Sequence, residues 1–245
     1  MNLRTASCVA AVAAVTSVLQ VNANPGVLFN DAIGDIDASI NTGGGTLDLV
    51  SMEVSHTATD IQFKLTVNGN IGSTDWGKFM VGIANNKGNG TSSSDGWGRP
   101  ITMSANGGMT NWLGGWVDGV DGGGGAENYS NQTSWGLTGA TYNSNFGNFA
   151  LAAGAQSTIT YGVSIASIGM SIGDTFRFDA YSSGGGSGDS AVDALANPNA
   201  AITNWGQAYD SGTSTSFSYT LTAIPAPGAI ALIGLAGLVA RRRKA

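Results

Sequence analysis

Short stretches in which apolar and polar residues alternate recur through the middle of the chain. In the clearest of them, 60–67, every second residue is apolar, from Ile61 to Val67. This period of two predicts a β-strand with one buried face. A similar stretch at 46–55 precedes it, and 56–59 is predicted to connect the two as a hairpin loop. Further strands are predicted over 78–84, 100–104, 111–117, 157–165, 175–181 and 215–221.

Glycine, asparagine and serine separate these stretches, and glycine alone supplies 38 of the 245 residues. Between 24 and 223 no segment keeps a helical period, although 190–195 is compatible with a single helical turn. Many short strands with turn residues between them are typical of an antiparallel β-sandwich, here expected to be jelly-roll-like. Residues 24–223 are long enough to form one such domain.

The first 23 residues have the three parts of an export signal. Arg4 forms a short basic region, an apolar run follows, and Val21-Asn22-Ala23 matches the small-x-small cleavage pattern. We therefore predict a signal peptide over 1–23, cleaved after Ala23. The sole cysteine, Cys8, lies within it, so the mature chain is expected to have no disulfide and no thiolate metal site.

The last 22 residues, 224–245, combine a proline motif, an uncharged apolar segment and a basic end. Pro225-Ala226-Pro227 is expected to end the last strand, because proline lacks the N–H that a strand ladder needs. Residues 228–240 are predicted to form a short transmembrane helix of about 20 Å. The basic cluster after it should stay cytoplasmic and leave the domain outside. That cluster is Arg241, Arg242, Arg243 and Lys244.

This tail resembles the PEP-CTERM sorting signals of bacterial envelope proteins. The resemblance implies an exosortase-type membrane protease as a partner, besides the export machinery. The central glutamate of the family motif is replaced here by Ala226, which leaves open whether a standard exosortase or a variant reads the tail. The chain is thus expected to be in the inner membrane in transit, and then in the cell envelope or outside the cell.

The domain resembles, more weakly, DOMON-like and ninth-family carbohydrate-binding modules, which are β-sandwiches. The matching pieces are LDLVSMEVSHTATDIQFKLTV and STITYGVSIASIGMSIGDTFRFDAYSS. The resemblance implies a sandwich fold and polysaccharide as a ligand, and it carries no individual binding residue.

Charge excludes one class of partner. Residues 24–223 hold five basic and all sixteen acidic residues, a formal charge of −11. A phosphate backbone needs a stripe of lysine and arginine, so we expect no binding to nucleic acid.

Four tryptophans gather in a glycine-rich segment and form a candidate glycan platform. An indole presents a flat apolar face that can stack on a sugar ring, and glycine lets a backbone approach a ligand closely. Tryptophans are also large core fillers, and this ordinary interpretation is kept beside the platform interpretation. The four are Trp97, Trp112, Trp116 and Trp135.

Two groups of acidic residues could bind calcium, which prefers oxygen ligands. One group has Asp31 after Asn30, followed by Asp35 and Asp37. The other, chosen as the candidate metal site, is Asp118, Asp121 and Glu127. Neither has the spacing of an EF-hand loop, and solvated loop acids are an alternative for both.

Catalytic chemistry is weakly represented. The only histidine, His56, falls in the predicted hairpin loop, where we expect it to be solvated. Glu53 and Glu127 are the only glutamates, and no nucleophile-elbow motif is present. We therefore expect a non-enzymatic envelope or matrix protein. A carbohydrate-binding module and a secreted glycan-cleaving enzyme are the two alternatives.

Overall fold

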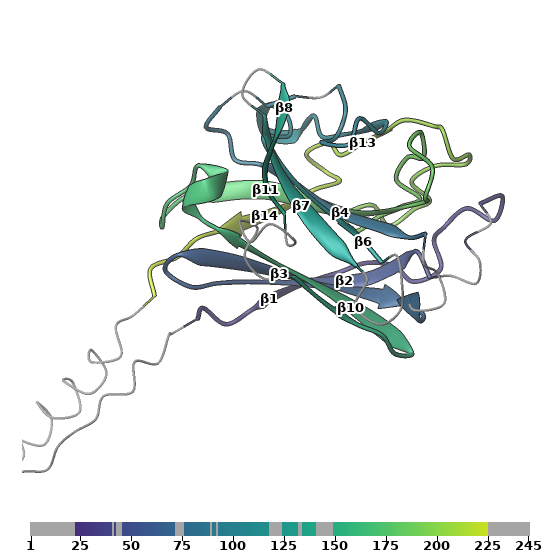
Figure 1. Cartoon of the computed structure of the whole chain (residues 1–245), viewed down its shortest axis with the longest axis horizontal. Coiled ribbons are helices and arrows are strands. Elements are labelled where there is room, and N and C mark those ends of the chain that lie inside the picture. Colours follow the sequence, from purple (N-terminus) through teal and green to yellow (C-terminus); the bar gives the residue numbers. More distant parts are fainter. Residues whose placement is uncertain are drawn as a thin grey trace, which may run out of the picture. The chain divides into compact units, whose positions relative to one another are not determined.

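The computed structural model describes residues 23–40, 42, 46–71, 76–88, 90–91, 93–117, 124–131, 134–140 and 149–224. Their main elements are two antiparallel sheets, which form the layers seen in Figure 1. In the first, the order is β1 (Val27–Asn30), β2 (Asp48–His56), β3 (Asp60–Asn68), β10 (Gln156–Ser164) and β9 (Phe149–Ala152).

The second sheet has seven strands, and a separate pair of very short strands is parallel. The order in the seven-stranded sheet is β12 (Asp193–Ala194), β11 (Thr175–Ser183), β4 (Lys78–Ala84), β6 (Asn111–Trp116), β7 (Gly125–Asn131) and β8 (Trp135–Ala140), with β14 (Phe217–Thr220) also paired to β11. The parallel pair is β5 (Ile101–Thr102) and β13 (Tyr209–Asp210). The elements also include the 3₁₀ turns η2 (Ala105–Gly107) and η4 (Ala166–Ile168).

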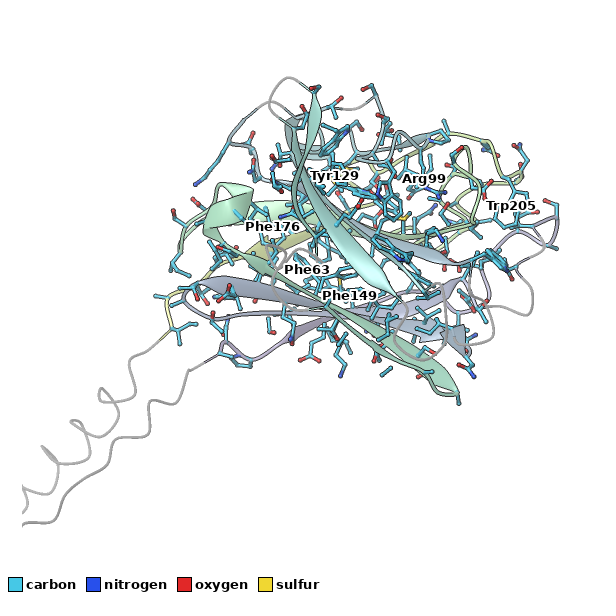
Figure 2. The ribbon with its side chains drawn as sticks, viewed as in Figure 1. Phe63, Arg99, Tyr129, Phe149, Phe176 and Trp205 are labelled. Carbon is cyan, nitrogen blue, oxygen red and sulfur yellow. The ribbon has the colours of Figure 1, made fainter. Side chains whose placement is uncertain are left out.

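The two sheets pack face to face through an aromatic core, as Figure 2 shows around Phe63 and Phe176. Phe178 of β11 meets Phe29 of β1 and Phe63 of β3, with ring centroids 5.0 and 5.9 Å apart. The Tyr161 hydroxyl donates a 2.7 Å hydrogen bond from the first sheet to the Phe79 carbonyl of the second. These contacts confirm the predicted all-β, antiparallel sandwich.

Loops cover the outer face of the seven-stranded sheet and form a second packed layer there. Tyr181 of β11 hydrogen-bonds Ser211 and lies 6.1 Å from the Tyr209 ring. Trp97, in the loop before β5, packs on Trp112 of β6. Side chains on both faces of the central strands β4, β6 and β11 are therefore mostly buried, which suppresses the alternation expected of a strand with one wet face.

Most predicted strands are present, and one predicted element is wrong. The stretch 78–84 matches β4, and 60–67 matches β3 to within one residue. The helical turn expected at 190–195 is instead occupied by β12, because Val192 N–H donates to the Ser182 carbonyl and Leu195 N–H to Ala180. Pairing with β11 overrides the local preference.

Residues Ala23–Ile224 form one compact unit. Within the described residues no helix is long and apolar enough to cross a membrane. The predicted leader, apart from Ala23, lies outside those residues. So do the Pro225-Ala226-Pro227 motif, the helix expected at 228–240 and the basic cluster Arg241–Lys244.

Candidate functional site

The four tryptophans of the glycine-rich segment pack into the outer layer and do not form a flat row. Trp112 is fully buried. The Trp97 ring meets it at 4.4 Å with an interplanar angle of 72°, and meets Trp116 at 6.2 Å and 47°. Trp97, Trp116 and Trp135 are half-buried, and Trp135 donates its indole N–H to the Ser94 carbonyl. Trp112 thus presents no face to a ligand.

The glycines around these rings make space for indoles. A Cβ at Gly114 would lie 2.1 Å from the Trp112 ring, and one at Gly125 would lie 2.5 Å from Trp116. At Gly96, a Cβ would lie 2.9 Å from Trp112. At these three positions glycine is therefore explained by aromatic packing, without a ligand.

The candidate metal residues Asp118 and Asp121 lie outside the described part of the chain. Their expected partner, Glu127 of β7, accepts hydrogen bonds from the Trp97 indole N–H and the Tyr129 hydroxyl, each 2.9 Å long. This carboxylate holds two aromatic rings in place.

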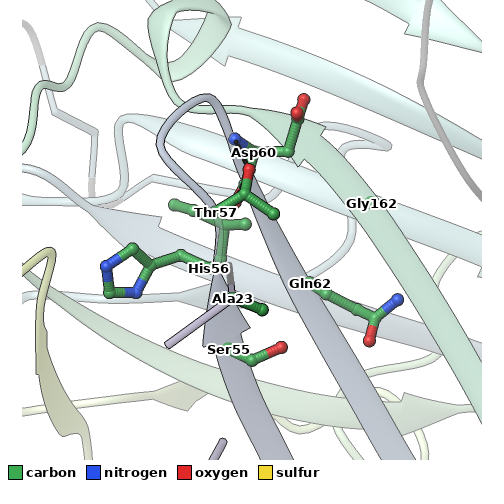
Figure 3. Close-up of a pocket in the computed structure, with 8 residues that line it drawn as sticks. Ala23, Ser55, His56, Thr57, Asp60, Gln62 and Gly162 are labelled. Atoms are coloured by element: carbon green, nitrogen blue, oxygen red, sulfur yellow. Dashed lines mark hydrogen bonds between the residues drawn. The ribbon is translucent and has the colours of Figure 1, made fainter. Parts of the chain in front are cut away.

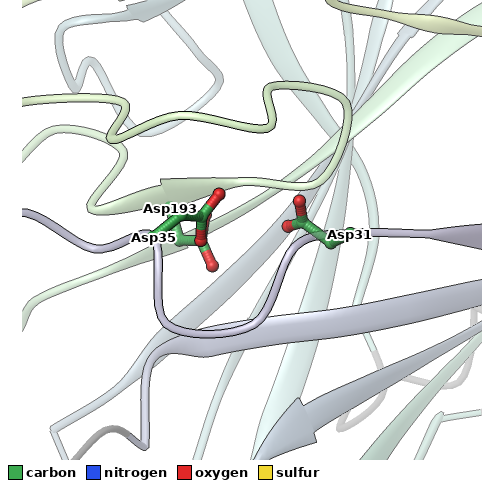
Figure 4. A group of neighbouring side chains, drawn as sticks. All are labelled: Asp31, Asp35 and Asp193. Atoms are coloured by element: carbon green, nitrogen blue, oxygen red, sulfur yellow. The ribbon is translucent and has the colours of Figure 1, made fainter.

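A different group of carboxylates comes together between the two sheets. Asp31 follows β1, Asp35 lies in the loop after it, and Asp193 begins β12 of the opposite sheet. One carboxylate oxygen from each lies within 4.8 Å of the others (Figure 4). Asp193 is 1% exposed, whereas the other two are half-buried. Asp37 is not a member of this group. Its Oδ1 accepts hydrogen bonds from the backbone N–H and the hydroxyl of Ser39.

Burial and mutual repulsion disfavour negative charge in this group. Burial is the main cause that raises the pKa of Asp31 to about 9, and the charge of Asp193 adds to it. Burial also raises the pKa of Asp35 and of Asp193, the latter well above its ordinary value. The neighbouring charges that contribute are all carboxylates, including Asp48 and Asp179.

A second pair of tryptophans borders an open concavity of about 410 Å³. It is lined by Trp76, Gly184, Gly185, Asp189 and Trp205. The two indole rings are half-buried, 6.3 Å apart and inclined at 70°. Neither indole N–H donates a hydrogen bond within the described residues, so both are available to a ligand.

A buried arginine supports the loop that forms this concavity. Arg99 donates from Nη1 to Ser183 Oγ at 2.8 Å and to the Asp189 carbonyl at 3.1 Å. Figure 2 labels Arg99 near Trp205 on the loop side of the molecule. The Asp189 carboxylate accepts from Gly186 N–H at 2.8 Å, which fixes one oxygen and leaves the other for a ligand.

His56 is not the solvated loop residue that the sequence predicted. It ends β2, is 1% exposed, and contacts the Tyr219 hydroxyl at 2.7 Å and the Thr222 carbonyl at 3.0 Å. Figure 3 shows its ring on the opposite side of β2 from Ser55, beside a cavity of about 330 Å³. Since adjacent strand residues point to opposite faces, Ser55 and His56 cannot act as a nucleophile and its base.

The two ends of the compact unit lie side by side. Asn24 N–H donates to the His56 carbonyl at 2.8 Å, and its side-chain amide donates to Thr222 Oγ1 at 3.0 Å. The first residue after the predicted leader and the segment just before the predicted tail are therefore hydrogen-bonded to each other.

Sequence reasoning missed Asp193, Trp76 and Trp205. Asp31 and Asp35 were visible as an acidic group, but Asp193 joins them only through the pairing of β12 with β11. Trp76 and Trp205 stand alone in the sequence, and no local signal connects them.

Comparison with known proteins adds no relative. No protein-family model, no curated protein and no solved structure matches this chain. The functional argument therefore depends on the sequence signals and on the geometry described above.

Proposed function

We propose that this chain is an exported, non-enzymatic protein of the bacterial cell envelope or extracellular matrix, sorted through its PEP-CTERM-like tail. The observation that carries the proposal is the pairing of an export leader (1–23) with a tail in which Pro225-Ala226-Pro227, an apolar segment and four basic residues follow in order. Its partners are the export machinery and an exosortase-type membrane protease.

The arrangement of the chain ends supports this proposal. Asn24, which follows the proposed leader, donates a hydrogen bond to Thr222, which precedes the proposed tail in the sequence. A membrane protease could then act on the tail without opening a sheet. The sandwich would remain folded before and after processing.

The described side chains also favour a non-enzymatic role. Ser55 points away from His56, and both ring nitrogens of the histidine have partners. Glu53 is exposed on β2, and Glu127 holds Trp97 and Tyr129 in the other sheet. The two glutamates do not form the facing pair that glycoside hydrolysis needs.

Mass spectrometry of the protein extracted from its native cell surface tests this function. We expect an N-terminus at Asn24 and a C-terminus that lacks the basic residues Arg241 to Lys244. Recovery of mature protein with that segment intact would contradict tail processing. Retention of residues 1–23 in the surface protein would contradict export by the leader.

Glycan binding is the second candidate function, and the concavity at Trp76 and Trp205 favours it. Two inclined indole faces, two available indole N–H donors and the Asp189 carboxylate are the groups that a sugar ring can contact. The buried Trp112 offers none of these. Another polar concavity, at Asn85 and Asn111, is less suitable because the Asn85 amide already donates to the Ile168 carbonyl at 2.7 Å.

Substitution of Trp205 by alanine tests the glycan site. We expect about tenfold weaker retention on a polysaccharide that binds the wild type, since stacking contributes about 0.5–1.5 kcal/mol beyond buried area. Affinity electrophoresis against a polysaccharide panel measures it, with Trp135→Ala as the matched control. Loss of retention only in the control would move the site to the glycine-rich segment, and no retention by the wild type would remove the binding hypothesis.

A further inference from the structure

We propose that Asp31, Asp35 and Asp193 bind one calcium ion, which ties the loop after β1 to the edge of the opposite sheet. Asp31 and Asp35 lie in the loop after β1, Asp193 begins β12, and the three side chains converge between the sheets (Figure 4). The site keeps Asp31 and Asp35 of the first acidic group in the sequence, with Asp193 in place of Asp37, and it differs from the Asp118, Asp121 and Glu127 group. It is independent of export and glycan binding.

Unsatisfied oxygens are the first support for the site. Both carboxylate oxygens of Asp35 and Oδ2 of Asp31 are closed off from solvent and accept no hydrogen bond within the described residues. Buried polar atoms in folded proteins nearly always have a partner. Three such oxygens in one cluster point to a cation as their shared partner.

Ser182 provides a second, independent sign of a missing partner. It lies directly opposite Asp193 in the β11–β12 register, so both side chains are on the same face of the sheet. Ser182 is fully buried, and its hydroxyl oxygen has no hydrogen-bond partner in the described chain. A neutral oxygen on the same sheet face as Asp193 can extend the set of oxygen donors to a hard cation.

Charge balance points in the same direction. The charged groups that act on the cluster are further carboxylates, so no described lysine or arginine compensates it. Buried carboxylates need a counter-charge or a proton. A divalent cation neutralises them while keeping all three deprotonated.

The donor atoms and their spacing favour calcium. All the donors are oxygens, which hard cations prefer over nitrogen or sulfur. Calcium–oxygen distances of about 2.3–2.6 Å allow two ligands to lie up to about 5 Å apart across one ion. The 4.8 Å limit within the cluster meets this condition. Magnesium demands near-octahedral geometry and usually keeps several waters, so a site built from protein oxygens suits calcium better.

An ion here would join the two sheets. Asp193 already accepts a 2.7 Å hydrogen bond from Leu49 N–H of β2, next to the β-bulge at Leu49–Ser51. Adding Asp31 and Asp35 as ligands fixes the long loop between β1 and β2 to the same point. Calcium should therefore stabilise the folded chain.

The experiment is a thermal melt of the full-length protein in chelator and in calcium chloride. We expect the melting temperature to rise by about 5–10 °C at a hundredfold excess of calcium over its Kd, and calorimetric titration to give one calcium per chain. The variant D35N should lose this rise, because it removes one of the three carboxylate ligands. It should still fold, because the substitution is isosteric and the Asp35 carboxylate accepts no hydrogen bond in the described chain. D31N provides a second test of the same kind.

D37N is the matched control, since Asp37 lies two residues from Asp35 and faces Ser39. It should keep the full calcium response. An unchanged melting temperature for the wild type, or a full response in D35N, would overturn the proposal. The same shift with magnesium in both the wild type and D35N would also overturn it, because that result indicates a general ionic effect.

Discussion

Replacing Trp112 with alanine is expected to lower the free energy of unfolding by about 3–5 kcal/mol. The Trp112 ring is fully buried between β6 and the loop layer, in contact with Trp97 and Tyr129. Its removal leaves a cavity that the surrounding sheet and loops can close only in part. Denaturant unfolding followed by far-ultraviolet circular dichroism measures the loss.

Two further variants distinguish the loss of Trp112 packing from a general sensitivity of this sheet to substitution. Gly114→Ala should also destabilise the chain, because its Cβ would lie 2.1 Å from the Trp112 ring. Leu137→Ala in β8 should change the free energy by less than about 0.5 kcal/mol, since Leu137 is 48% exposed. A loss below about 1 kcal/mol for Trp112→Ala would contradict a core role and return this ring to the candidate glycan platform.

Alternation predicted the strands whose two faces differ. In β3, Ile61, Phe63 and Leu65 are buried while Gln62 and Lys64 between them are exposed, and the period of two is plain. In β4, six successive residues are buried because the sandwich core covers one face and the loop layer the other. The apolar run of β4 was still recognisable as a strand, since short buried runs suit strands better than helices.

The strands that escaped prediction have little sequence signal of their own. β7 reads GAENYSN and contains only two apolar side chains. It is held by pairing with β6 and β8 on either side. Such pairing is a tertiary effect, because what stabilises a strand is its neighbours more than its own propensity.

Residue type also failed to separate core from surface in the candidate sites. Trp112 and Trp205 have the same chemistry, but one is fully buried and the other borders an open concavity. The acidic cluster has the same limit, since the order of the chain gives no reason to place Asp193 beside Asp31. In both cases the fold, and not the residue type, decides which side chains can form a site.

Stability should fall as the pH rises from about 4 to about 8, and Asp95 should be one identifiable cause. Asp95 is fully buried in the loop that carries Trp97. Burial is the main cause that raises its pKa from 3.8 to about 7, even though hydrogen bonds and the charge of Arg99 act in the opposite direction. Well below pH 3.8 the carboxyl is protonated in both the folded and the unfolded chain, so its contribution to stability is complete there.

Between those two pKa values the unfolded chain loses the proton while the folded chain keeps it. The folded state therefore loses about 4 kcal/mol by the time the pH passes 7, at 1.36 kcal/mol for each pKa unit. Asp95→Asn should remove this part of the pH dependence. The asparagine oxygen can still accept from Trp97 N–H and Arg99 N–H, and its amide replaces the Oδ2 that accepts no bond in the described chain.

The measurement is chemical unfolding of both proteins from pH 4 to pH 8 in chelator, which removes any contribution from bound metal. We expect equal stability near pH 4 and a more stable variant near pH 8. Asp174→Asn is a control that should lower stability above pH 4 instead of raising it. The hydrogen bond from Lys87 lowers the pKa of Asp174, so the ionised carboxylate stabilises the folded chain there. Parallel pH profiles for the wild type and Asp95→Asn would mean that Asp95 is ionised throughout, with Arg99 compensating for its burial.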